Sequence, residues 1–232
     1  MPDAQEPSSP PRTGRRRRLW AVVAVLGCLL AGLAAAARHE PAYYHERLSA
    51  GADAAAARRL VTKVASLQAA ISRPGSWDAA LDESEINAWL ATDLPANHAR
   101  LLPAGIHDPR LRLSSGRVDL AVRVGPAFTP AVLHLALQIH LRGENQLAIG
   151  IDEAGLGLIP LPRAAIAAEL GRRLGRLGAT TSLRRLDGGS ELVVYIPPAS
   201  AAGGTIRRLG SFAVVEGSLL VAGETQAGGM PR

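Results

Sequence analysis

The chain has very little of several residue types that usually indicate a function. Cysteine occurs once, as Cys28, so no intramolecular disulfide can form. Aromatic residues make up 3% of the chain, too few for a surface that stacks sugars or nucleotide bases. The histidines lack the spacing of a zinc site, since His134 and His140 would lie about 20 Å apart on an extended strand. We therefore expect no metal and no cofactor.

Catalytic sequence motifs are also absent. The chain contains no H-E-x-x-H, C-x-x-C, G-x-S-x-G or P-loop sequence, and Gly155-x-Gly157 lacks the third glycine of a dinucleotide site. Asp152 and Glu153 are adjacent in a predicted strand, which directs their side chains to opposite faces and makes them poor partners for acid–base chemistry. The sequence therefore predicts a protein that is not an enzyme.

The distribution of charge argues against nucleic-acid binding. The formal net charge is +6, but residues 1–18 hold five arginines against Asp3 and Glu6 and so carry +3 of it. The remaining +3 is spread over the rest of the chain, without the clusters of basic and aromatic residues that bind DNA or RNA. We expect no nucleic-acid partner.

What the chain does contain is one long apolar run. Residues 19–37 include no charged side chain, and a helix of that length just covers the hydrocarbon core of a bilayer. Four arginines, Arg15 to Arg18, precede the run, and the positive-inside rule then keeps the N-terminus in the cytoplasm. We predict a single-pass transmembrane helix of the signal-anchor type in the cell inner membrane, with the following domain extracytoplasmic.

Two other interpretations of this run stay open. Ala35-Ala36-Ala37 offers a cleavage site for a secretory signal, although the run is longer than the usual 7 to 15 or so residues of such signals. The sequence Val25-Leu26-Gly27-Cys28 resembles the lipobox of a lipoprotein, but cleavage there would leave a stranded apolar segment over residues 29–37. We favour the uncleaved anchor.

The remaining residues are predicted to form one domain. Residues 1–18 have the composition of a disordered basic cytoplasmic tail, and residues 38–57 are interpreted as a juxtamembrane linker. The extracytoplasmic domain is predicted over residues 58–225, and residues 226–232 as a disordered tail. A body of this size has room for one hydrophobic core.

Helical periodicity occurs in three segments. The first begins near residue 58 and stops at Arg73-Pro74-Gly75. The second follows Leu81, and the third begins after Pro162 and ends at Gly178. The apolar face of the first segment consists of Leu60, Val64, Leu67 and Ile71.

The second segment carries the clearest local signals. Asp82 is the predicted N-cap, with Glu85 reaching back to it, and Pro95 is expected to end the helix. We predict that Trp89 anchors the helix in the core. Asn87 is expected to satisfy a neighbouring backbone group rather than to perform chemistry.

The hydrophobic period changes to two from about residue 106. Alternating residues up to about 151 predict a four-stranded antiparallel meander with one apolar face, after which residues 155–162 leave the sheet. Further strands are predicted over 180–186, 191–196, 205–215 and 218–224. The predicted fold class is therefore α+β, with an antiparallel sheet packed against two or three amphipathic helices.

Small residues accompany the apolar face of the third predicted helix. A glycine inside a helix costs about 1 kcal/mol relative to alanine, so Gly171 and Gly175 indicate that something packs closely there. A sheet is the ordinary occupant, and an acyl chain is the alternative. The residues of the hypothetical apolar groove are Leu133, Leu135, Leu137, Ile166, Leu170, Gly171, Leu174 and Gly175.

Four stretches carry a resemblance to known proteins: PAYYHERL after the apolar run, residues 85–90, residues 102–110 and residues 155–162. They resemble an uncharacterised group of bacterial single-pass membrane proteins and, more distantly, the YpmS-like extracytoplasmic proteins and the tubular lipid-binding (TULIP) domains. The distant resemblance implies a curved antiparallel sheet wrapped on a long helix, with an interior that holds lipid in some relatives. It assigns no ligand residue to a position in this chain.

Two functions follow from these features. In the first, the chain is a membrane-anchored, non-catalytic extracytoplasmic module that binds a lipid, an acylated ligand or another amphiphile near the bilayer. In the second, the apolar faces close on each other as a dry core, and the chain is a cell-envelope structural or assembly protein that acts through a protein partner.

Overall fold

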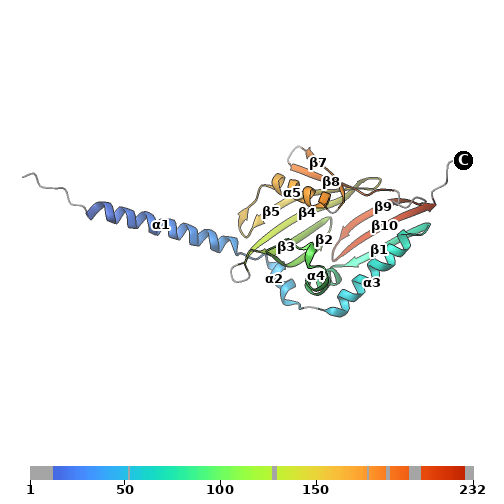
Figure 1. Ribbon diagram of the computed structural model, residues 1–232, viewed down its shortest axis with the longest axis horizontal. Coiled ribbons are helices and arrows are strands. Elements are labelled where there is room, and N and C mark those ends of the chain that lie inside the picture. Colours follow the sequence, from blue (N-terminus) through green and yellow to red (C-terminus); the bar gives the residue numbers. More distant parts are fainter. Residues whose placement is uncertain are drawn as a thin grey trace, which may run out of the picture.

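The computed structural model describes residues 13–51, 53–126, 130–176, 178–186, 189–198 and 205–227. A long helix, α1 (Thr13–Ala37), leads into a body in which helices lie against two antiparallel sheets (Figure 1). The α+β class predicted from periodicity is confirmed.

The larger sheet contains the predicted meander. Its strands are antiparallel and run in the spatial order β2-β3-β4-β5-β8-β7. A short strand, β6 (Ile159–Pro160), folds back onto β5, so residues 155–162 do not leave the sheet directly as predicted. The strand bounds are Ile106–Ser114 (β2), Arg117–Val124 (β3), Ala131–Gly143 (β4), Gln146–Leu156 (β5), Thr180–Leu186 (β7) and Gly189–Tyr195 (β8).

The smaller sheet has the order β1-β10-β9. Strands β9 (Thr205–Val215) and β10 (Ser218–Ala227) form the predicted hairpin, and β10 includes two residues of the predicted tail, whose remainder lies outside the described residues. Strand β1 (Gly75–Asp82) was not predicted, because its partner in β10 lies far away in the chain and its sequence has no clear alternation.

The helices of the body are α2 (Ala42–Ser49), α3 (Ala54–Ile71), α4 (Glu83–Asn97) and α5 (Arg163–Arg176), and a short 3₁₀ turn, η1 (Ala99–Leu101), follows α4. On α3, Leu60 is buried but Val64 is 43% exposed, so the predicted apolar face is buried only in part. Pro95 lies inside α4 rather than ending it. Only two residues of α4 follow the proline, so the missing N–H affects the last turn alone.

The predicted capping box at the start of α4 is wrong. Asp82 is the N-cap residue, but its side chain makes no capping hydrogen bond. Its carboxylate instead accepts from Lys63 Nζ at 2.6 Å, and Glu85 accepts from Arg59 Nε at 3.2 Å. Both acids are used to join α4 to α3, because a charged partner stabilises a carboxylate more than a backbone N–H does.

The segment predicted as a linker, residues 38–57, contains α2 and the beginning of α3. The Tyr44 side chain of α2 is fully buried against Ala121 of β3 and Val132 of β4, and its hydroxyl donates to Asp108 O at 2.8 Å. Burial raises the pKa of Tyr44 to about 12. This segment therefore packs on the body.

The hydrophobic core lies on one face of the larger sheet. Buried residues from β2 to β5 meet Val214 of the smaller sheet and Ala167 of α5, and Ile86 of α4 packs against them. The opposite face is the charged face expected from the alternation in β3, and α2 covers part of it. The sheet therefore has a dry side and a polar side.

Candidate functional site

Part of the predicted groove on β4 and α5 belongs to the hydrophobic core. Leu137 is 8% exposed and belongs to the core, and Leu135 and Ile166 pack against the same cluster. Leu133, Leu170 and Leu174 are half-buried. The structure therefore brings the central members of the set together as core.

The two glycines of α5 differ in their surroundings. A Cβ at Gly171 would lie 3.0 Å from Leu192 Cδ1 of β8, so the helix packs closely on the sheet at this point. A Cβ at Gly175 would have no atom within 4 Å among the described residues outside its own helix turn. The sheet explains the first glycine, and no neighbour among the described residues explains the second.

We expect Gly175→Ala to raise the free energy of unfolding by about 0.5 kcal/mol, because alanine has the higher helix propensity and the added methyl group meets nothing. Gly171→Ala should stabilise less or destabilise, since Leu192 would have to move. Urea denaturation of both variants measures the difference. An equal gain in the two would show that α5 does not pack closely at Gly171.

A different apolar cavity lies between the two sheets, with a volume of about 670 Å³. This is within the range of about 300–1,000 Å³ that small-molecule sites occupy. Its walls come from α3, all three strands of the smaller sheet (β1, β9 and β10), the start of β5 and the residues that follow β8. The apolar lining residues are Leu67, Ile71, Trp77, Leu147, Ile196, Pro197, Leu209, Phe212, Leu219 and Val221.

Trp77 is held in the cavity wall by hydrogen bonds. Its indole N–H donates to Thr225 Oγ1 at 3.1 Å, and that hydroxyl donates to Ile71 O at 2.9 Å. This chain of bonds joins β1, β10 and α3. A Cβ at Gly223 would overlap the Trp77 ring, so the glycine makes room for the indole.

Two polar residues, Asn145 and Arg207, also line this cavity. Asn145 is 3% exposed, and its side chain donates to Arg207 O at 2.9 Å and accepts from Leu209 N at 2.6 Å. The amide of Asn145 is thus hydrogen-bonded to the backbone of the edge strand β9. By contrast, Arg207 Nε is buried and has no hydrogen-bond partner in the part of the chain that the structure describes. An arginine whose Nε has no partner among the described residues therefore borders an apolar cavity.

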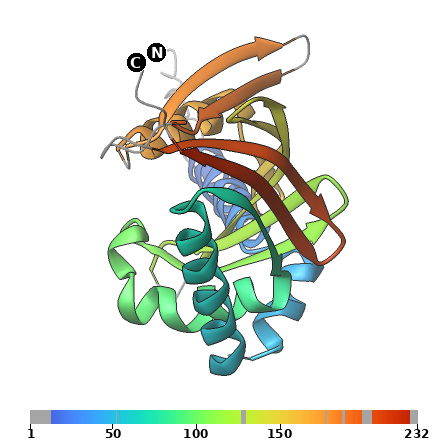
Figure 2. The ribbon, with the colours of Figure 1, turned by 90° about the vertical axis from the view of Figure 1, so that its right-hand side faces the viewer.

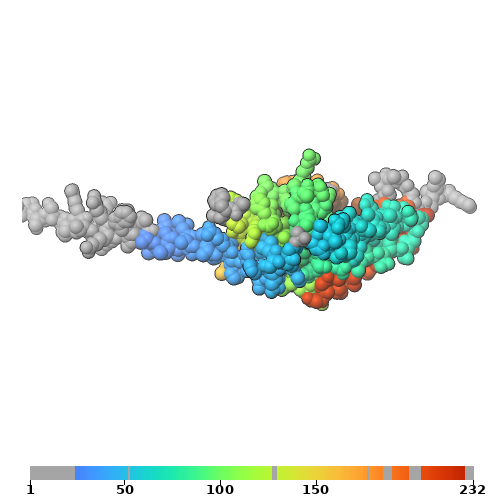
Figure 3. All heavy atoms as spheres, turned by 90° about the horizontal axis from the view of Figure 1, so that it is seen from below, coloured from blue at the N-terminus to red at the C-terminus, as the bar shows by residue number. Residues whose placement is uncertain are grey.

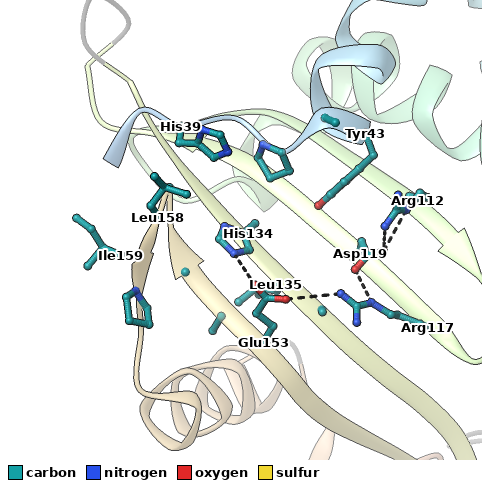
Figure 4. A pocket seen from close by; sticks show the side chains of 17 residues that line it. His39, Tyr43, Arg112, Arg117, Asp119, His134, Leu135, Glu153, Leu158 and Ile159 are labelled. Carbon is teal, nitrogen blue, oxygen red and sulfur yellow. Dashed lines mark hydrogen bonds and ion pairs between the residues drawn. The ribbon is translucent and has the colours of Figure 1, made fainter. Parts of the chain in front are cut away.

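A second pocket, of about 500 Å³, lies on the polar face of the larger sheet, beside the end of α1 (Figure 4). Its central group is Asp119, which is 3% exposed. Arg112 Nη2 and Arg117 Nε donate to the two oxygens of this carboxylate, at 2.8 and 2.7 Å. The two arginines therefore neutralise a buried negative charge, and both side chains line the pocket.

His134 lines the same pocket. Its Nε2 lies 3.5 Å from Glu153 Oε1, and its Nδ1 is buried without a hydrogen-bond partner among the described residues. The imidazole lies over Gly155, its partner across the ladder, where a Cβ would overlap the ring. Burial, and to a smaller extent the Asp119 carboxylate, raise the pKa of the neighbouring Tyr43 phenol well above its usual range, so Tyr43 stays a hydrogen-bond donor.

The pocket adjoins the joint between α1 and the body. Leu158 N, in the turn between β5 and β6, donates to Ala36 O at 2.8 Å. Gly157 has φ +58° in this turn, and a Cβ there would overlap the α1 backbone. Gly155 thus makes room for the His134 ring, and Gly157 makes room for the α1 backbone. Two glycines so close together in the sequence indicate that another group packs against the backbone there, but they do not indicate which group.

Sequence reasoning missed both pockets. Each pocket is built from elements that are distant in the chain. No local sequence feature distinguishes Arg207, which lines the apolar cavity, from the adjacent Arg208. Over the described residues, no group of three or more His, Cys, Asp or Glu side chains could hold a metal ion. Comparison of the chain with protein-family models, curated proteins and solved structures finds no match.

Proposed function

We propose that the chain is a membrane-anchored, non-catalytic extracytoplasmic module that binds a lipid or another amphiphile in the cavity between its two sheets. The observation that carries the proposal is the apolar cavity of about 670 Å³ bordered by Arg207. An acyl chain fits the lining, and an acidic headgroup is the partner that a guanidinium prefers. The distant resemblance to tubular lipid-binding domains points the same way and stays a prediction.

The anchor in this proposal is α1. Over the described residues, no helix combines the length and the apolar content needed to cross a membrane. The predicted span begins at residue 19, and the side chains of residues 13–23 are not among those described. Residues 24–35 of α1 are exposed and stand clear of the body (Figure 3), and the large apolar side chains among them are at least 54% exposed. Such a surface is stabilised when lipid surrounds it.

The cavity is tested with the full chain in phosphatidylcholine nanodiscs, titrated with 12-bromododecanoate. Bromine quenches nearby indoles, so we expect quenching of Trp77, obtained as the difference between this protein and its Trp77→Phe variant. Arg207→Gln should weaken the titration about tenfold, because it removes a charged hydrogen bond. Arg208→Gln is the matched control, since Arg208 pairs with Glu144 at 3.0 Å outside this cavity.

Equal quenching in the protein and in Trp77→Phe would contradict the cavity as the acyl site. An Arg207→Gln variant that binds as well as Arg208→Gln would keep the acyl site but remove the preference for an acidic headgroup. A narrowed cavity, made by Val221→Phe, should abolish the Trp77 quench without changing the fold as judged by circular dichroism.

A second candidate function, assembly through a protein partner, is favoured by the outer edge of β7. Figure 2 shows the β7–β8 hairpin extending from the body, and in the described residues no strand pairs with the outer side of β7. Asn87 and Asn145 bond to the edges of β2 and β9, whereas Leu183 of β7 is 46% exposed. An unpaired edge is suited to an added strand. Absence of the Trp77 quench would favour this function.

A further inference from the structure

The second pocket lies beside the C-terminal end of α1, where the headgroup of a membrane lipid could reach it. The hydrogen bond between Leu158 N and Ala36 O fixes the pocket beside the last turn of α1. If α1 crosses the bilayer, its C-terminal turn lies at the level of the headgroups. Leu158 is 64% exposed at this joint, and an exposed leucine beside the bilayer is stabilised by contact with lipid.

We propose that this pocket binds the phosphoethanolamine headgroup of a membrane lipid, with the phosphodiester at Arg112 and Arg117 and the ammonium at Glu153. The inference rests on the anchoring part of the proposed function, because the anchor brings the pocket to the bilayer surface. It is independent of the apolar cavity, which lies between the two sheets on the other side of the larger sheet.

The phosphate half of the site is built by the two arginines. A guanidinium has five N–H donors, and Asp119 accepts from two of them on Arg112 and from one on Arg117. Both side chains are about 40% exposed, so their remaining donors are open to the pocket. Because their hydrogen bonds to Asp119 already fix both guanidinium groups, the arginine side chains lose little conformational entropy when a phosphate binds.

The ammonium half is Glu153. Its side chain is 62% exposed, and its neighbours Arg117 Nη2 and His134 Nε2 lie 3.7 and 3.5 Å away, beyond a short hydrogen bond. The carboxylate can therefore accept N–H donors from a ligand. The charges of Arg112 and Arg117 balance those of Asp119 and Glu153, so the pocket suits a headgroup with one charge of each sign better than a net anion.

The same geometry disfavours phosphocholine. A quaternary ammonium has no N–H to donate to Glu153, and it is usually bound over an aromatic face. The phenol ring of Tyr43, which lines the pocket, already has the Arg112 guanidinium 4.7 Å from its centroid. The pocket is thus equipped to select a primary amine.

The test uses the full chain in maltoside micelles, which contain no phosphate, titrated with water-soluble sn-glycero-3-phosphoethanolamine. This probe has no acyl chains and cannot fill the apolar cavity. Binding is followed by NMR shifts of the His134 ring, assigned with His134→Gln. We expect saturable binding that is about tenfold weaker for sn-glycero-3-phosphocholine, because the charged hydrogen bond to Glu153 is missing.

Glu153→Gln should remove the preference for the amine while retaining binding of the phosphate. Glu144→Gln is the matched control: Glu144 is 61% exposed, pairs with Arg208 outside this pocket, and should leave the titration unchanged. Arg112→Gln should weaken the binding of both probes, while the hydrogen bond from Arg117 to Asp119 keeps the buried carboxylate paired.

Three results would overturn the inference: no saturable shift with either probe, equal affinity for the two probes, or an unchanged preference in Glu153→Gln. These outcomes are separate from those of the proposed function. A bromododecanoate titration without quenching would contradict the apolar cavity as a lipid site but would not bear on the headgroup site. Extraction of the full chain from membranes by alkaline carbonate would contradict the anchor, and the titration with the headgroup probes could still be interpreted.

Discussion

Replacing Asn87 by alanine is expected to lower the free energy of unfolding by about 3 kcal/mol. Asn87 is 8% exposed on α4, and its side chain donates to Leu111 O at 2.8 Å and accepts from Leu111 N at 2.9 Å. Leu111 lies on β2, the first strand of the larger sheet, so the amide takes the place of a neighbouring strand. Its loss leaves two backbone groups unpaired where water is scarce, and each costs about 1–3 kcal/mol.

Asn97→Ala is the matched control for Asn87→Ala. Asn97 is an exposed residue of the same helix, and its amide donates to Asp93 Oδ1 at 2.6 Å. Its replacement should change stability by less than about 0.5 kcal/mol. Urea denaturation of both variants measures the two effects. If Asn87→Ala proved as mild as Asn97→Ala, the edge of β2 would not depend on this side chain.

The second large effect is expected from Gly223→Ala. A methyl group at Gly223 would overlap both the Arg208 carbonyl oxygen of β9 and the Trp77 ring. The carbonyl belongs to the backbone and cannot rotate away, so β10 must separate from β9 or the indole must leave its place. Overpacking of this kind typically costs about 1–3 kcal/mol. Because Trp77 lines the apolar cavity, bromododecanoate should also bind more weakly.

Gly210→Ala controls for the loss of a glycine in the same pair of strands. A Cβ at Gly210 would meet Ala222 O at 3.7 Å, which is an ordinary contact. We expect its stability and its Trp77 emission to match those of the parent protein. A Gly223→Ala variant with unchanged emission and stability would contradict the close packing of the indole on β10.

Much of the secondary structure follows from the sequence, because side-chain periodicity reports which face of an element is buried. Alternation predicted β2 to β5 and the later strands, and spacing predicted α3, α4 and α5 but not α2. The role of Asn87 was also predicted correctly and confirmed, since a polar residue on the buried side of a helix needs a partner. These inferences depend only on neighbours in the chain.

Other features depended on residues distant in the chain. Lys63 and Arg59 took Asp82 and Glu85 away from the expected capping box, and β1 formed because β10 offered it a partner. The predicted groove on β4 and α5 is core at its centre, because the smaller sheet and α4 cover that face.

By itself, the sequence determined the apolar run, the α+β class and the polarity of the faces of the sheet, because each of these follows from side chains a few residues apart. The tertiary structure decided where empty space and unpaired donors remain. Arg207 and Arg208 are neighbours of identical chemistry, yet one borders the apolar cavity and the other pairs with Glu144. That difference arises from the packing of two sheets, and no local pattern records it.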